Sequence, residues 1–296
     1  MNAVFGIDHP LLATHDIVEL RQRLIALGFS MTAIGKHPWG TSTSLAMFEG
    51  CLLEIMGIYD DSLIDEIPAG NFHFGRHIYE HLQQREGVAL TALHSTDSQR
   101  DADRAAQAGF YVAGHLEFGR NVILPDGCTG RTKTTLALLP DPTFLRLSFF
   151  LCQQHRPDLI YVPEWLQHPN TVNGIAGITI VAHGGHHAVL KSRFGGLYGG
   201  GADIAGGMAF KTANGIVRIL EPQTFTDTVG SLPFSITCDK LPFIAGMDFT
   251  LSDPTVFRTF ALSSGLKFNE RGGCLTLLDP ALTANTVLRF FHPDTA

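Results

Sequence analysis

The chain has 296 residues, of which 45% are hydrophobic, and this length allows one large core or two domains. Its formal net charge at pH 7 is −7 and it has no run of Lys or Arg, which excludes the basic surface typical of proteins that bind nucleic acids or anionic membranes. It has neither an apolar stretch of about 18 residues nor a signal-peptide pattern, so we expect a cytoplasmic protein. We expect its partner to be a small molecule, and a homodimer is the assembly that we consider besides a monomer.

The first 58 residues predict one supersecondary unit. Residues 4–13 are typical of a strand, and Asp16 can then accept hydrogen bonds from the free N–H groups at the start of a helix. Apolar residues follow at helical spacing until Gly28, which permits a left-handed helix end. Three further strands are predicted at residues 30–36, 42–48 and 51–58. The unit is therefore βαβββ.

The spacing of twelve residues between the capping Asp and the final Gly recurs along the chain. It separates Asp16 from Gly28, Asp97 from Gly109, and Asp253 from Gly265. A less regular copy between Gly177 and Leu220 keeps the step from Gly184 to Gly196 but lacks the Asp. Because repeated units bury their apolar faces against their neighbours, this pattern predicts an α+β fold of four βαβββ modules.

Two longer segments separate the modules. Residues 67–86 connect the first module to the second, and residues 156–173, which contain several Pro, Trp, Tyr and Asn, connect the second to the third. We expect the second segment to be a linker or a lid, because long loops in compact proteins are often binding loops. The predicted halves are residues 1–155 and 174–296.

Three segments of the first module resemble the glyoxalase-like branch of the vicinal oxygen chelate (VOC) superfamily. They are Asp8-His9-Pro10 on the first strand, His37-Pro38-Trp39-Gly40-Thr41 between the second and third strands, and Leu52-Leu53-Glu54-Ile55-Met56-Gly57 on the fourth. The resemblance implies that paired modules form two cup-shaped, partly closed mixed sheets with helices outside. It also implies a divalent metal held by the first and fourth strands. The superfamily's chemistry ranges from isomerisation and ring cleavage with oxygen to metal-free drug sequestration.

His9 and Glu54 are the expected metal ligands, and Glu54 is the expected catalytic residue. The positions equivalent to His9 in the second and last modules hold Leu90 and Gly246, so of these three modules only the first offers an imidazole there. Glu54 lies among apolar strand residues, where a carboxylate costs on the order of a few kcal/mol to bury unless a cation or hydrogen bonds compensate.

The third ligand should come from the second module, and His155 is our prediction because it ends that module's last strand. Alternatively, His155 begins a loop and Gln153 or Gln154 supplies an amide oxygen, while His94 is the second-ranked imidazole. Two His and one Glu with open positions suit one divalent transition metal, which could be Fe(II), Zn(II), Mn(II) or Ni(II).

The second half is predicted to have lost its site. Glu221 falls at a sequence position similar to that of Glu54, but its partner position is Gly177. His186 and His187 open a predicted helix, where adjacent side chains diverge, so we interpret them as solvated.

Other polar residues are expected to contact substrate. His37 and Thr41 flank a tryptophan between two strands, although a tight turn with a packed indole explains the same residues. Arg120 is a candidate for binding an anionic group, although an exposed Arg is more often a surface charge. Trp165 and His168 lie in the segment that we expect to act as a lid.

These observations favour a divalent-metal-dependent enzyme of the lyase/isomerase or dioxygenase type that acts on a small oxygen-bearing substrate. The alternative is a metal-free protein that binds or sequesters a small molecule, as bleomycin-resistance proteins do. A structural role with a decayed site is the third hypothesis, and metal analysis of purified protein separates the first two.

Overall fold

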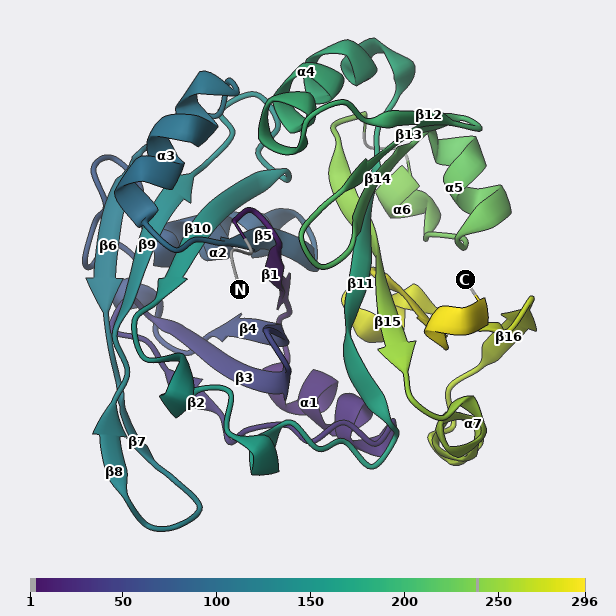
Figure 1. Ribbon diagram of the computed structural model, residues 1–296, viewed down its shortest axis with the longest axis horizontal. Helices are drawn as coiled ribbons and strands as arrows, with labels where there is room; N and C mark the ends of the chain where they lie inside the picture. The colour runs from purple at the N-terminus through teal and green to yellow at the C-terminus, as the bar shows by residue number, and fades with distance from the viewer. Residues whose placement is uncertain (1–3, 238–239, 296) are drawn as a thin grey trace.

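A computed structural model describes residues 4–237 and 240–295. Two eight-stranded mixed sheets lie side by side, the first on the left of Figure 1 and the second on the right. In spatial order, the first sheet contains β2 (Gly35–Lys36), β3 (Thr41–Phe48), β4 (Cys51–Ile58), β1 (Ile7–Ala13), β5 (Gly87–His94), β10 (Ser148–Gln154), β9 (Thr134–Leu139) and β6 (Gly114–Phe118). The second contains β12 (Ala202–Ile204), β13 (Gly207–Lys211), β14 (Ile216–Leu220), β11 (Val172–Val181), β15 (Phe243–Leu251), β18 (Val287–Phe291), β17 (Cys274–Leu277) and β16 (Phe268–Arg271).

The topology confirms four βαβββ modules and the α+β class. In each sheet the first strands of two modules pair antiparallel at the centre, as β1 with β5 and β11 with β15. Each of these strands also pairs in parallel with the last strand of its own module, which is β4, β10, β14 or β18. The last strand of the first sheet ends at Gln154 and β11 of the second begins at Val172, so the connection is slightly shorter than the predicted 156–173. It contains the short 3₁₀ helices η2 (Pro157–Leu159) and η3 (Pro163–Trp165). The division into two domains stays a prediction.

The helices that follow the capping aspartates are confirmed. They are α1 (Ile17–Ala26), α3 (Ser98–Gln107) and α7 (Pro254–Ser263). Asp16, Asp97 and Asp253 each accept a hydrogen bond from a backbone N–H in the first turn. The third module has a 3₁₀ turn, η4 (Gly184–His186), in place of the Asp cap, and α4 (His187–Tyr198) follows it.

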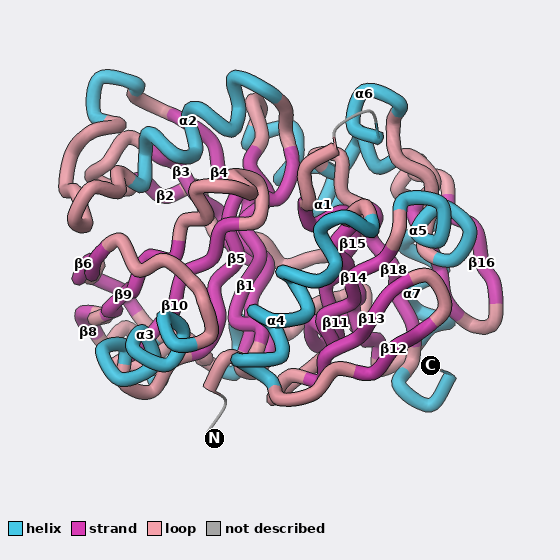
Figure 2. The backbone as a smooth tube through the Cα atoms, turned by 90° about the horizontal axis from the view of Figure 1, so that it is seen from above, coloured by secondary structure: helices cyan, strands magenta, loops and turns pink. Residues whose placement is uncertain are grey.

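The sequence did not predict α2 (Phe74–Gln84), which lies within the first connecting segment. Its apolar residues Phe74, Ile78 and Leu82 are buried against one face of the first sheet, while α3 covers the other face (Figure 2). The helix approaches the turn after β2 closely, because a Cβ on Gly75 would lie 2.1 Å from the carbonyl oxygen of Trp39. Only glycine fits there.

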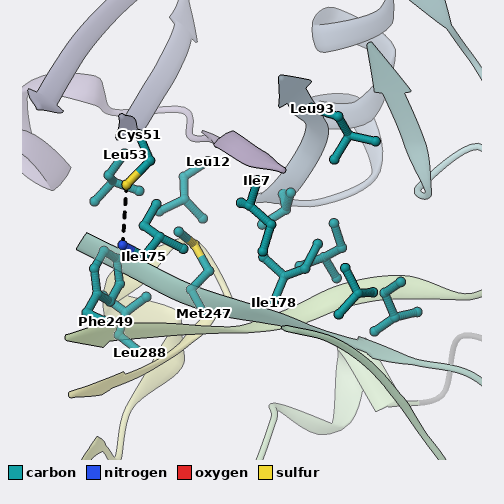
Figure 3. Close-up of a cluster of buried hydrophobic side chains, with 14 of the residues drawn as sticks. Ile7, Leu12, Cys51, Leu53, Leu93, Ile175, Ile178, Met247, Phe249 and Leu288 are labelled. Carbon is teal, nitrogen blue, oxygen red and sulfur yellow. Dashed lines mark hydrogen bonds between the residues drawn. The ribbon is translucent and has the colours of Figure 1, made fainter. Parts of the chain in front are cut away.

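The two sheets share one core (Figure 3). Ile7, Leu12 and Leu53 from the first sheet pack in the same cluster as Ile178 and Met247 from the second. The opposite face of the second sheet is covered by α5 (Pro222–Thr228) and α6 (Phe234–Thr237), and Phe225 and Val229 of the α5 region fill it. None of the described helices is long and apolar enough to cross a membrane.

Candidate functional site

The first sheet encloses a cavity of about 490 Å³ on the face that α2 covers. Most of its lining side chains are apolar, among them Met47, Met56, Phe74, Phe118 and Phe150. A smaller set of polar side chains faces the same space: His9, Ser30, Thr32, His37, Glu54, Arg120, Thr132, Thr134, Gln154 and Glu164. An apolar cavity with a small set of polar groups is typical of a site for a small molecule.

His9 is positioned by an irregularity in β1. The register between β1 and β5 shifts between Ile7 and His9, which changes the direction in which the following side chains point. Asp8, which is fully buried, lies behind the imidazole, with its Oδ1 2.6 Å from His9 Nδ1. Asn214, in the turn between β13 and β14, donates to the Ile7 carbonyl and accepts from the Ile7 N–H, both at 2.8 Å. The second half thus holds the strand that carries His9.

Glu54 faces His9 from β4. Its Oε2 lies 3.3 Å from His9 Nε2, and its Oε1 accepts a hydrogen bond from Thr43 Oγ1 at 2.5 Å. Burial alone lowers the pKa of His9, but the carboxylates of Asp8 and Glu54 outweigh it and raise the pKa to about 9. Burial alone raises the pKa of Glu54, but the imidazolium lowers it to about 2. Without a metal, the two groups form a buried imidazolium–carboxylate pair.

The chemistry of this pair fits a metal ion. Because Asp8 accepts the hydrogen bond from His9 Nδ1, Nε2 is the nitrogen available as a ligand, and a carboxylate behind a metal-binding imidazole is the usual supporting arrangement. A second oxygen of Asp8, Oδ2, is buried without a hydrogen-bond partner among the described residues. Ligand atoms of Asp8, His9 and Cys152 all lie within 4.8 Å of one another.

The structure does not bring His155 to this pair. Phe150, Cys152 and Gln154 of β10 line the cavity, whereas His155 is exposed and its Nε2 lies 2.8 Å from Thr135 Oγ1. Side chains alternate between the two faces of a strand, so the residue after Gln154 faces away. Gln154, one of the alternatives that the sequence left open, and Cys152, which we had interpreted as core, are the second-module ligand types in the lining.

His94 belongs to the buried surroundings of the pair and does not line the cavity. Its Nε2 lies 3.5 Å from Asp8 Oδ2. Alternate residues of β10 face the cavity, and this alternation was the sequence signal that could have identified Cys152 and Gln154 as lining residues.

Of the predicted substrate contacts, His37, Arg120 and Trp165 line the cavity. Thr41 is buried and does not line it, but its Oγ1 lies 2.9 Å from His37 Nδ1. His168 has a structural position: its Nδ1 accepts from the Ser30 N–H at 2.9 Å, and its Nε2 donates to the Met47 carbonyl at 2.8 Å. These bonds occupy both ring nitrogens, so this placement does not support substrate contact by His168.

The connecting segment contributes more lining residues than Trp165 alone. Leu159, Ile160 and Glu164 border the cavity with it. Residues of an irregular loop follow no periodic pattern, so the sequence predicted a lid without identifying which of its side chains line the cavity.

In the second sheet, the structural counterpart of Glu54 is Arg218, which corrects the comparison with Glu221. In the first module the Thr14 N–H donates to the carbonyl of Met56, which lies two residues after Glu54. In the third module the Ala182 N–H donates in the same way to the carbonyl of Leu220, which lies two residues after Arg218. Asp248 forms ion pairs with both Arg218 and Arg289. Two guanidinium groups around one carboxylate disfavour a bound cation.

Comparisons with known proteins identify the family and the fold. The family model described as a glyoxalase-like domain matches residues 7–191. No match was found among curated proteins.

Three solved structures share the fold at 11% identity each. A hypothetical protein from Staphylococcus aureus has a TM-score of 0.67, with 96% of this chain and 98% of that chain covered. A mutant 4-hydroxymandelate synthase from Streptomyces coelicolor has a TM-score of 0.57, with 97% and 92% covered. A fusion of a xylose isomerase-like TIM barrel with 4-hydroxyphenylpyruvate dioxygenase also has a TM-score of 0.57, with 98% of this chain and 48% of that chain covered. Together with the family match, the paired βαβββ modules identify the chain as a member of the glyoxalase-like domain family with the VOC fold.

Proposed function

We propose that this protein is a divalent-metal-dependent enzyme that acts on a small oxygen-bearing substrate in the cavity of the first sheet. The observation that carries the proposal is the buried pair of His9 and Glu54, whose Nε2 and Oε2 atoms lie 3.3 Å apart at the cavity wall. Two ligand-type groups rarely occupy an apolar strand face without a compensating role.

His9 Nε2 and a Glu54 oxygen would hold the metal, together with Gln154 or Cys152 from β10. An imidazole, a carboxylate and an amide suit Fe(II), Mn(II), Ni(II) or Zn(II), whereas a thiolate from Cys152 would favour Zn(II). A bound divalent ion would polarise two neighbouring oxygens of a substrate as a Lewis acid.

The protein groups around the site have separate roles in this proposal. Asp8 keeps His9 Nδ1 protonated and Nε2 directed into the cavity, and Thr43 orients Glu54 through its Oε1. In the metal-free protein the pKa of Glu54 is low because His9 is an imidazolium; with His9 neutral as a ligand, Glu54 would be the carboxylate at the site that could accept a proton from a substrate atom. The apolar lining from Phe74, Met56 and Phe150 excludes water and strengthens these interactions.

A metal-free binding function is the second hypothesis, and one observation favours it. His9 and Glu54 already neutralise each other as an ion pair, so the apolar cavity is electrostatically satisfied without a cation. Such a cavity could hold an apolar ligand.

Metal titration decides between the two hypotheses. We expect wild-type protein to bind about one equivalent of Zn(II), Mn(II), Ni(II) or anaerobic Fe(II) in calorimetry, and the variants His9→Ala and Glu54→Gln to bind at least tenfold more weakly. Glu221→Gln, in the second half, is the matched control and should bind as wild type. Cys152→Ser and Gln154→Ala then identify the third ligand. Wild-type metal affinity in both first-module variants would refute the metal site and favour the binding protein.

A further inference from the structure

The guanidinium of Arg120 lies at the edge of the cavity without an acidic partner. Among the described residues, no carboxylate forms an ion pair with it, whereas Arg104 and Lys133 elsewhere in the second module do form such pairs. Its backbone is fixed on both sides, since Thr132 Oγ1 accepts from its N–H at 3.0 Å and its carbonyl accepts from the Thr132 N–H at 2.9 Å. The position of this cation is therefore set by the hairpin that leads into β7 (Asn121–Ile123) and β8 (Thr129–Arg131).

His37 orients the side chain without neutralising it. Arg120 Nη2 lies 3.5 Å from His37 Nε2, and because a guanidinium only donates, Nε2 must present its lone pair. Burial lowers the pKa of His37 to about 4, so the ring is neutral at pH 7 and its Nδ1–H points to Thr41 Oγ1. The imidazole is stacked on Trp39, with ring centroids 4.8 Å apart, which fixes its plane. Most of the guanidinium donors remain available.

A chain of contacts limits the separation between Arg120 and the His9–Glu54 pair. A Cβ on Gly35 of β2 would lie 3.4 Å from Arg120 Nη1 and 3.8 Å from Thr43 Cγ2, and Thr43 Oγ1 donates to Glu54 Oε1 at 2.5 Å. The cation therefore lies within roughly 12 Å of the carboxylate. The lining between the two polar ends is mainly apolar, with Leu45, Met47, Met56, Trp39 and Phe118.

The other ionisable groups in the lining do not cancel this cation. Glu54 is paired with His9, and Glu164 is exposed on the connecting segment. An organic anion would thus meet an oriented, uncompensated Arg at one end of an apolar cavity.

We propose that Arg120 binds the anionic group, a carboxylate or sulfonate, of a small ligand with an apolar body. The second part of the proposal, that oxygen atoms at the other end of the ligand, within roughly 12 Å of this group, reach the His9–Glu54 pair, rests on the proposed function. The substrate class is therefore an amphipathic organic anion with polar groups at both ends.

Two fluorescent probes of similar size and shape test the anion site in metal-free protein. 1-Anilinonaphthalene-8-sulfonate carries a negative charge, and N-phenyl-1-naphthylamine is neutral. We expect Arg120→Gln to weaken binding of the sulfonate about tenfold, equivalent to about 1.4 kcal/mol, and to leave the affinity of the neutral probe unchanged. Arg120→Lys should recover part of the sulfonate affinity, and Arg131→Gln on β8 is the control with no expected effect.

The neutral probe should also displace the sulfonate, because both would occupy one cavity. An equal effect of Arg120→Gln on both probes, no effect on either, or absence of displacement would each overturn the proposal. Zn(II) affinity should be the same in Arg120→Gln and wild type. If wild type binds the probes as expected but no metal, the metal-dependent function fails while the anion site stands.

Discussion

Asn214 offers a test of how the second half supports the site, although it does not line the cavity. Asn214→Ala removes both hydrogen bonds to Ile7, and Ile7 is itself fully buried beside the bulge that directs His9. A net hydrogen bond contributes about 0.5–1.5 kcal/mol, and an unpaired buried backbone group costs about 1–3 kcal/mol. Because Asn214 is exposed, water can replace part of the loss, so we expect a destabilisation of about 1–3 kcal/mol.

The same substitution should weaken metal binding three- to tenfold, because Ile7 is no longer held by Asn214 and the bulge between Ile7 and His9 is less firmly fixed. Urea denaturation measures the free energy of unfolding, and calorimetric titration with Zn(II) at 25 °C measures affinity. Asn269→Ala, on the exposed edge strand β16, is the control for a surface asparagine. Lower stability with unchanged metal affinity would show that Asn214 stabilises the contact between the two sheets but does not position His9.

Two further predictions concern pH and the connecting segment. Burial lowers the pKa of His81 to about 3, below its unfolded value of 6.5, so the unfolded state binds more protons between these values and stability falls as the solution is acidified. From pH 7 to pH 5 this residue should account for about 2 kcal/mol of lost stability, and denaturation curves of His81→Leu should lack that part of the slope; an identical slope in the variant would contradict this assignment. Amide exchange in residues 156–173 should slow when a ligand fills the cavity, because Leu159, Ile160 and Trp165 line it, and unchanged protection at saturation would count against a lid.

The repeated parts of the fold were predictable from the sequence because each depends on local chemistry. An Asp that caps a helix and a Gly that ends it act within twelve residues, so α1, α3 and α7 follow from the spacing alone. Helix α2 lacks the local start signal of the other helices, because His73 makes no capping hydrogen bond from its side chain, but Phe74, Ile78 and Leu82 recur every four residues, which is a helical spacing that could have identified it. Its stability comes from packing on the sheet, which is a tertiary effect.

The site was predictable where a residue type was unusual for its position. A Glu in an apolar strand is unusual, and the resemblance to glyoxalase-like proteins, which implies ligands on the first and fourth strands, paired Glu54 with His9. The ligand from β10 was harder to predict, because successive residues of a strand point to opposite faces. Gln154 lines the cavity, whereas His155, one position later, is exposed. The unpaired state of Arg120 depends on distant residues and could not be read from the sequence.

The core between the sheets has a consequence for how this protein can be divided. Leu12 and Leu53 of the sheet that carries His9 and Glu54 are covered by Ile178 and Met247 of the second sheet. Cutting the chain between the halves would expose this surface to water, and a fragment ending at residue 155 should aggregate. The second sheet thus serves the first as a permanent internal partner, whatever chemistry its own face carries.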